Sequence, residues 1–154
     1  MSTEPPASGD PDRLRTGLVR YVGYANEVGE SFRPLVPRAA VNATYVAATG
    51  YVMADAAWRS NTLPANSPRS PFVEIVDTLI WQGLASIVVP GFTINRVVWA
   101  ASRLTAAGSR VPTMAGLACI PLIVHPIDLG VDWVLTTFVR PSYPDSRSDS
   151  AKGT

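Results

Sequence analysis

The sequence predicts an all-α, multi-pass membrane protein with three or four membrane-embedded helices and an N-terminal amphipathic helix. Charged residues make up only 16% of the 154 residues, against roughly 25% in an average soluble domain. Three stretches contain no charge, 39–54, 78–95 and 111–127, each near the lower length limit for crossing a bilayer. All four tryptophans lie near charges at the ends of these stretches, as in an aromatic belt: Trp58, Trp81, Trp99 and Trp133.

Composition argues against several classes of function. The net charge is +1 and the chain has a single lysine, so we expect no nucleic-acid partner. One cysteine and one histidine make a zinc site improbable, and we expect no metal and no cofactor. No nucleophile elbow, phosphate-binding glycine loop or metal-ligand spacing is present. The chain is therefore expected to have no catalytic residues and not to be an enzyme.

The two ends of the chain have the composition of disordered tails. Residues 1–12 are polar, acidic and rich in proline, and they match neither a secretory signal nor a mitochondrial presequence. Residues 141–154 are similarly polar. Between them, we expect a single helical membrane domain over 13–140, with any targeting signal inside it.

Segment 13–33 is predicted to form the amphipathic helix. Apolar residues recur at steps of three and four from Leu14 to Phe32, and Pro34 and Pro37 end the pattern. Two placements remain open: the helix lies in the membrane interface, or it packs against the other helices.

The first span is predicted near 37–57. One face consists of small residues that would allow a close approach of backbones in lipid. We expect this face to pack on the second span or on another copy of the chain: Ala39, Ala43, Ala47, Gly50 and Ala54.

The second span is predicted near 73–95. Asp77 falls in its first turns, where the helix dipole favours an anion. Pro90 lacks a backbone N–H, so a helix is expected to kink or stop there, and Gly91 suits a C-terminal cap.

A separate helix is predicted near 94–107. Arg96, Arg103 and Arg110 repeat every seven residues and form a basic stripe. We expect this helix to lie along the membrane surface with its arginines among the lipid headgroups.

The third span is predicted near 111–127, and a surface or half-span helix near 126–140. Pro126 suits the first turn of the latter, and Asp128 complements its dipole. His125 and Asp128, with Asp132, form the cluster that most resembles a proton relay.

The charges also predict an orientation. If the spans alternate in direction, one side of the membrane receives most of the arginines, including those of the amphipathic helix and of 94–110. The positive-inside rule places that side, and the N-terminus with it, in the cytoplasm or the mitochondrial matrix.

Three longer stretches resemble the mitochondrial fission process protein family, whose members are mitochondrial inner-membrane proteins of about eighteen kilodaltons. They are "RYVGYANEVGESFRPLVP" (20–37), "VDTLIWQGLASIVVPGFTINR" (76–96) and "IPLIVHPIDLGVDW" (120–133). The polar and backbone-shaping residues of these motifs are the candidate structural residues: Asn26, Glu27, Glu30, Pro90, Asn95, Arg96, His125, Pro126 and Asp128. We expect them to satisfy helix ends and to pair across the bundle, with Arg96 pairing to Glu27 or Glu30.

The resemblance implies a multi-pass mitochondrial inner-membrane protein that promotes fission and supports inner-membrane integrity. In that membrane, the charge distribution would put the N-terminus on the matrix side. Its expected partners are membrane lipids, inner-membrane proteins or a second copy of the chain. One alternative is a small carrier or proton-conducting protein that uses His125 and Asp128. Another is a soluble helical bundle with a buried pocket, because mean hydropathy is only +0.15.

Overall fold

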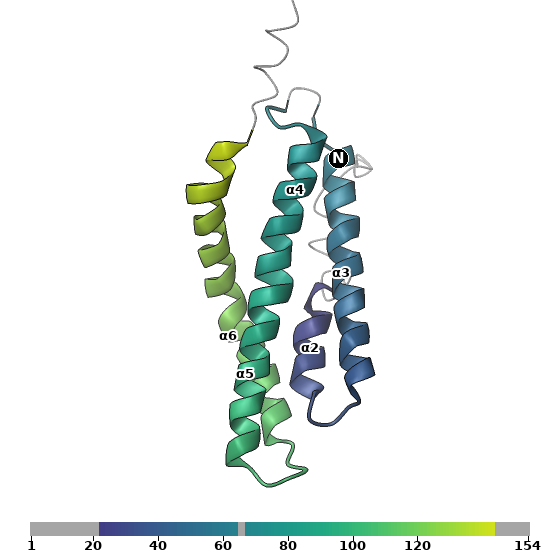
Figure 1. The fold of residues 1–154 in the computed structure, drawn as a ribbon, viewed down its shortest axis with the longest axis vertical. Coiled ribbons are helices and arrows are strands. Elements are labelled where there is room, and N and C mark those ends of the chain that lie inside the picture. The colour runs from purple at the N-terminus through teal and green to yellow at the C-terminus, as the bar shows by residue number, and fades with distance from the viewer. Residues whose placement is uncertain (1–21, 65–66, 144–154) are drawn as a thin grey trace, which may run out of the picture.

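The computed structural model describes residues 22–64 and 67–143, and the regular structure in these ranges is helical. A short helix, α2, precedes three long rods (Figure 1). The elements are α2 (Ala25–Phe32), α3 (Arg38–Asn61), α4 (Pro71–Gln82), η2 (Gly83–Val88), α5 (Val89–Leu104), α6 (Val111–Val134), η3 (Leu135–Val139) and η4 (Arg140–Ser142).

The three rods run side by side and reverse direction at each connection (Figure 1). The first is α3, whose 24 residues extend roughly 36 Å at 1.5 Å per residue. The second is the continuous helix Pro71–Leu104 and the third is Val111–Ser142. In the described part of the chain, these last two are long and apolar enough to cross a membrane. The all-α prediction is confirmed.

Local signals explain where the rods begin and turn. The Ser70 hydroxyl accepts a hydrogen bond from the Val73 backbone N–H at 3.3 Å, and Pro71 starts the helix with its fixed φ. Gly108 has a φ of +78° in the turn between α5 and α6, a conformation that glycine adopts without steric cost.

The expected break at Pro90 does not occur, so the separate surface helix near 94–107 is wrong. A π-helical segment, Gly83–Val88, precedes the proline, and the Val89 N–H donates to the Leu84 carbonyl five residues back. This wider turn accommodates the proline ring and its missing N–H without ending the helix. The second rod therefore continues past residue 95 to Leu104.

The expected start of a new helix at 126 is wrong for a similar reason. Pro121 and Pro126 both lie inside α6, and the rod continues through η3 and η4 to Ser142. A helix tolerates an internal proline when the hydrogen bonds on either side persist and neighbouring helices support it.

The small-residue face of α3 does not pack on the second rod as one alternative held. Ala39, Ala43, Ala47, Gly50 and Ala54 are all exposed. The opposite face is buried instead: Val41, Ala48, Val52, Asp55 and Ala56. That face carries Asp55, whose carboxylate needs partners inside the bundle. Contact of the small-residue face with another copy stays a prediction.

Helix α2 packs against α3, α5 and α6 in one half of the bundle. It buries polar residues, Asn26, Glu27, Glu30 and Ser31, and exposes the apolar Val28 and Phe32. Packing against the other helices is thus observed for this part of the predicted segment 13–33. The described residues do not include 13–21, the predicted tail 1–12 or positions 144–154 of the predicted tail 141–154. Of that second tail, Pro141 and Ser142 belong to η4, and Tyr143 donates to Asp77.

Candidate functional site

A buried carboxylate joins three helices near the α2–α3 turn. Glu30 of α2 is 2% exposed and accepts two hydrogen bonds from Arg33, one of them from Nε at 2.6 Å. It also accepts from Tyr45 Oη of α3 and from Asn95 Nδ2 of α5, each at 2.9 Å. We call these four residues the Glu30 cluster.

The Glu30 cluster keeps its carboxylate ionised. Burial alone would raise the pKa of Glu30, but the hydrogen bonds from Arg33, Asn95 and Tyr45 outweigh it and hold the pKa below its usual value. The cluster is therefore a charged set of hydrogen bonds that holds three helices together, rather than a proton donor.

The expected pairing of Arg96 with Glu27 or Glu30 is wrong. Arg96 is exposed on α5, donates to Asn95 Oδ1 at 2.6 and 3.2 Å, and lies over the rings of Phe92 and Trp99. The cation that pairs with Glu30 is Arg33, three residues along the same chain segment, because α2 ends there and the side chain can turn back. Asn95 contacts both groups: its amide nitrogen donates to Glu30, and its amide oxygen accepts from Arg96.

Gly91 serves close packing rather than helix capping. A Cβ atom at this position would lie 2.6 Å from Tyr45 Oη and 3.4 Å from Asn26 Nδ2. The Asn26 amide donates to the Ile87 carbonyl at 3.4 Å, and Pro90 is buried beside this contact. The motif residues Asn26, Pro90 and Gly91 thus hold α5 against α2 and α3.

Glu27 is a buried acid of a different kind. It is 1% exposed, and neither carboxyl oxygen has a hydrogen-bond partner among the described residues. Burial raises the pKa of Glu27 to about 7, and the negative charge of Asp128 adds to the rise. The interaction of the carboxyl with the Glu27 backbone lowers the pKa and offsets part of this effect.

A second polar cluster lies at the opposite end of the bundle. Asp77, 6% exposed, accepts from Arg140 Nε and Tyr143 Oη at 3.0 Å each and from Arg69 at 3.4 Å. Arg140 also donates to Asp132 at 2.8 Å. Asp77 therefore joins α4 to the end of the third rod, besides lying in the first turns of its own helix. We call these five residues the Asp77 cluster.

Asp55 forms a third tie, next to the Asp77 cluster. Its side chain is fully buried, accepts from Arg59 Nε at 3.0 Å and from the Gln82 amide, and so links α3 to α4. Sequence reasoning missed this contact, and it missed Tyr45, Arg33 and Arg140 as partners. Position was an available signal for two of these residues: Asp55 borders the uncharged stretch 39–54 and Tyr45 lies within it. Arg33 and Arg140 lie beside none of the three stretches.

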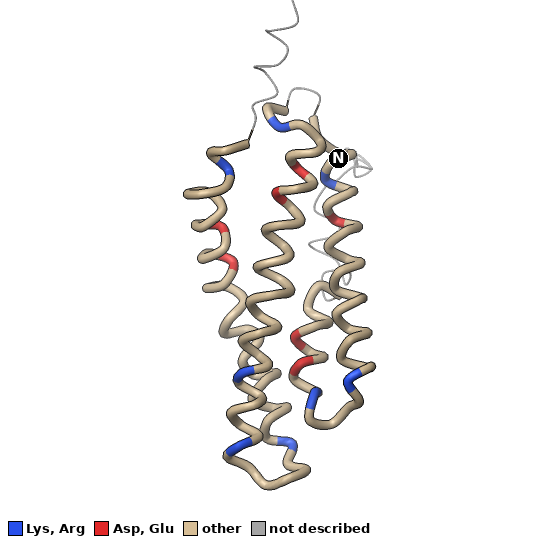
Figure 2. Tube along the Cα trace, viewed as in Figure 1, with Lys and Arg blue, Asp and Glu red and all other residues tan. Residues whose placement is uncertain are grey.

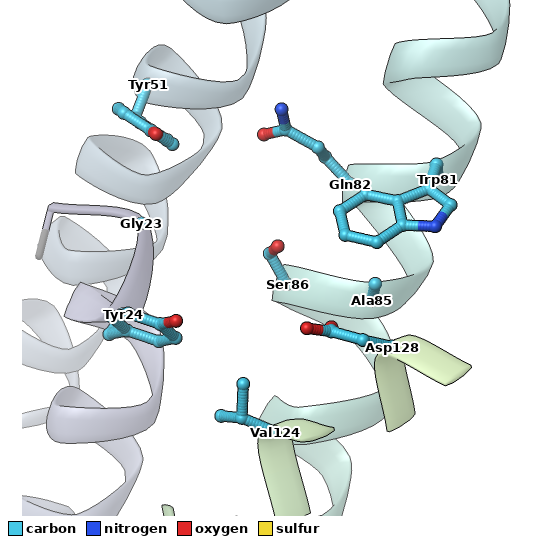
Figure 3. A pocket seen from close by; sticks show the side chains of 9 residues that line it. All are labelled: Gly23, Tyr24, Tyr51, Trp81, Gln82, Ala85, Ser86, Val124 and Asp128. Carbon is cyan, nitrogen blue, oxygen red and sulfur yellow. The ribbon is translucent and has the colours of Figure 1, made fainter. Parts of the chain in front are cut away.

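The third motif divides between surface and interior. His125 and Pro126 are exposed on α6, whereas Asp128 is half-buried and lines a cavity of about 230 Å³ (Figure 3). No group of three His, Cys, Asp or Glu residues suited to a metal ion occurs within the described ranges. Chemically, the site consists of buried polar contacts that link the helices and of two cavities, the second of about 370 Å³ and lined by the acids and arginines around Asp77.

Comparison with known proteins identifies the family. A family model described as "Mitochondrial 18 KDa protein (MTP18)" matches residues 9–70. Mitochondrial fission process protein 1 of Homo sapiens is 43% identical, over 94% of this chain and 95% of that protein. The proteins of the same name from Danio rerio and Caenorhabditis elegans are 43% and 38% identical, over 90% and 86% of this chain and 92% and 89% of theirs. No solved structure matches. The chain belongs to the mitochondrial fission process protein family.

Proposed function

We propose that this chain is a non-enzymatic, multi-pass protein of the mitochondrial inner membrane that promotes fission and supports inner-membrane integrity through protein partners. The family relationship supports the role in mitochondrial fission. The location in the inner membrane and the action through partners are our inferences from the arrangement of polar and apolar surface.

The observation that carries the proposal is an inverted distribution of side chains. Carboxylates and amides are buried, among them Glu27, Glu30, Asp55, Asp77 and Gln82. Large apolar side chains are exposed along all three rods, including Val46, Met53, Phe92, Leu122 and Phe138 at 62% or more. An apolar exterior of this extent is unfavourable in water and favourable in lipid, where polar groups must find partners inside the protein.

Three crossings follow if α3 accompanies the two apolar rods through the bilayer. Its length is sufficient, and most of its exposed central residues are small or apolar, with Asn42 and Thr49 as the polar exceptions between Ala39 and Ala54. Its own polar residues, Tyr45 and Asp55, bind inside the bundle. Helix α2 then occupies one half of the membrane depth without crossing it.

The charges at the two ends favour one orientation. Arginines gather at the end formed by the α2–α3 and α5–α6 turns, and most of the acids lie toward the other end (Figure 2). The basic end comprises Arg33, Arg38, Arg96, Arg103 and Arg110. The positive-inside rule favours the matrix for this end.

The outward small-residue face of α3 is the surface we assign to assembly. Small side chains permit the close helix contacts through which membrane helices associate. A second copy or another inner-membrane protein would bind there through Ala43, Ala47 and Gly50. Ala47→Leu should then weaken assembly, while Val46→Leu, on a neighbouring exposed position, should not.

The proposal is tested in cells that lack the endogenous protein. Full-length chain should restore mitochondrial fragmentation and remain in the pellet after carbonate extraction, whereas Ala47→Leu should stay in the pellet but restore fission less. Release by carbonate would contradict the membrane placement. Full rescue by Ala47→Leu would contradict action through this face.

The carrier or proton-conducting function is a second candidate, because Asp128 lines a cavity inside the bundle. His125 is exposed, so this alternative depends on Asp128 alone. Proton flux into liposomes that contain the purified chain, and its loss in Asp128→Asn, would favour it over the non-transporting role.

A further inference from the structure

One face of α5 carries two arginines on either side of a tryptophan. Phe92, Arg96, Trp99 and Arg103 follow one another at steps of four, three and four, so they lie on the same side of the helix, and all four are exposed. The guanidinium carbons of Arg96 and Arg103 lie 5.6 and 4.9 Å from the centroid of the Trp99 ring. The two carbons are therefore no farther apart than these two distances combined. We call these four residues the α5 arginine face.

No carboxylate of the described residues neutralises this face. The ion pairs within the described ranges use other arginines: Arg33, Arg59, Arg69 and Arg140. The sequence from residue 78 to residue 127 contains no aspartate or glutamate at all. Two positive charges that share one aromatic ring repel each other, and an anion bound to both would remove that repulsion.

The two guanidinium groups also have hydrogen-bond donors to spare. Arg96 donates from Nε and Nη2 to Asn95 Oδ1 at 3.2 and 2.6 Å, and the Asn95 amide nitrogen donates in turn to Glu30. These contacts orient Arg96 but use only part of a group that carries five N–H donors. The planar fork of arginine donates two parallel hydrogen bonds to a phosphate, so each of the two arginines can hold one phosphate group.

The surface beside the arginines favours a lipid over a free phosphate. Phe92 lies one turn before Arg96 and is 66% exposed, and Val88, one turn farther back, is 58% exposed. The rod is thus apolar toward its middle and basic toward the α5–α6 turn, where the arginines of the bundle gather (Figure 2). A phospholipid has the same order, with its acyl chains toward the membrane centre and its phosphate at the surface. Phe92 and Val88 would contact the chains.

We propose that the α5 arginine face binds an anionic phospholipid that carries two phosphodiesters, of the diphosphatidylglycerol class. One phosphate would bind Arg96 and the other Arg103, because the three-carbon bridge between them keeps both phosphates close to the Trp99 ring. A lipid with a single phosphate would engage only one arginine at a time. The inference rests on the membrane placement proposed above, in which this end of the bundle meets the headgroups.

The test measures lipid binding to the full chain, purified in detergent micelles, by native mass spectrometry. Tetraoleoyl-diphosphatidylglycerol should bind saturably, one lipid to a chain, and at least about tenfold more tightly than dioleoyl-phosphatidylglycerol, because hydrogen bonds from a second charged donor contribute about that factor or more. The double variant Arg96→Gln/Arg103→Gln should weaken binding of the first lipid at least about tenfold.

The matched control removes the same charge from the same end of the bundle. Arg38 begins α3 and Arg110 precedes α6; both are exposed, and neither belongs to the α5 arginine face. The double variant Arg38→Gln/Arg110→Gln should therefore keep the preference for the lipid with two phosphates.

Two results would overturn the site. Equal affinity of the unaltered chain for the two lipids would show that the second phosphate finds no partner, and this comparison decides the question even where a variant fails to fold. Equal weakening by the two double variants would show a general attraction to the basic end. Carbonate extraction of the same chain separates this failure from that of the proposed function: a chain that stays in the pellet loses only the lipid site, whereas a released chain loses the membrane placement.

Discussion

Replacing Glu30 with glutamine should destabilise the bundle more than any other single change in the motif that contains it. The carboxylate accepts hydrogen bonds from Arg33, Tyr45 and Asn95 and is 2% exposed. Glutamine keeps the shape, but it removes the charge and presents an NH₂ group to a neighbour that can only donate.

The magnitude follows from the exposure of the partners. Breaking a fully buried ion pair costs about 3–5 kcal/mol, because an uncompensated charge remains inside. Arg33 is 37% exposed and can rehydrate, so the loss should lie near the lower end. We therefore expect Glu30→Gln to lower the free energy of unfolding by about 2–4 kcal/mol, and Tyr45→Phe to lower it by about 1 kcal/mol.

A double-mutant cycle measures which residues interact energetically with Glu30. Unfolding of the purified chain in mixed detergent micelles gives the free energies. Glu30→Gln and Tyr45→Phe should be coupled by about 1 kcal/mol, because the two side chains share a hydrogen bond. Glu30→Gln and Arg96→Gln should be coupled more weakly than that, because Arg96 reaches Glu30 only through Asn95. Stronger coupling to Arg96 than to Tyr45 would refute this assignment.

Three further perturbations test the other ties by the same unfolding assay. Gly91→Ala should lower the free energy of unfolding by about 1–3 kcal/mol, because the new methyl group meets the Tyr45 hydroxyl. The control Gly50→Ala, which has nothing within 4 Å, should be neutral or stabilising. Equal effects of the two substitutions would contradict the close contact at Gly91. Because the pKa of Glu27 is raised from 4.5 to about 7, the folded chain holds a proton that the unfolded chain has lost, so stability should fall by about 3 kcal/mol as pH rises from 4.5 to 7. Glu27→Gln should remove that fall, and a fall of the same size in the variant would contradict the assignment. Asp77→Asn should lower stability by about 2–4 kcal/mol and be coupled to Arg140→Gln by more than 1 kcal/mol, while additivity would show that this ion pair is not a tie.

The helical class could be predicted from sequence because long stretches without charge alternate with turn-forming residues, and apolar residues recur at helical spacing. The continuity of the rods could not. Pro90 and Pro126 are local signals for a break, but a π-turn before Pro90 and intact hydrogen bonding around Pro126 override them. Whether a helix absorbs a proline depends on its neighbours, and one sequence does not specify them.

The sequence indicated which polar residues belong to the candidate site, but not which of them bind each other. Two contacts across the bundle are as expected of polar residues beside apolar runs: Asn95 donates to Glu30, and Asn26 donates to the Ile87 carbonyl. The rotation of each helix about its axis decides which partner is reached, and here it turns Arg96 outward. Rotation also explains the small-residue face of α3, since the same pattern fits contact inside or outside the bundle.

Labelling from the two sides of the inner membrane tests most directly whether the rods cross it. In a Cys119→Ser background, Ser67→Cys marks the α3–α4 connection and Ser109→Cys marks the α5–α6 turn. In mitoplasts, a membrane-impermeant maleimide should label the former at once and the latter only after the membrane is permeabilised. Equal labelling of both positions in intact mitoplasts would contradict a crossing between them.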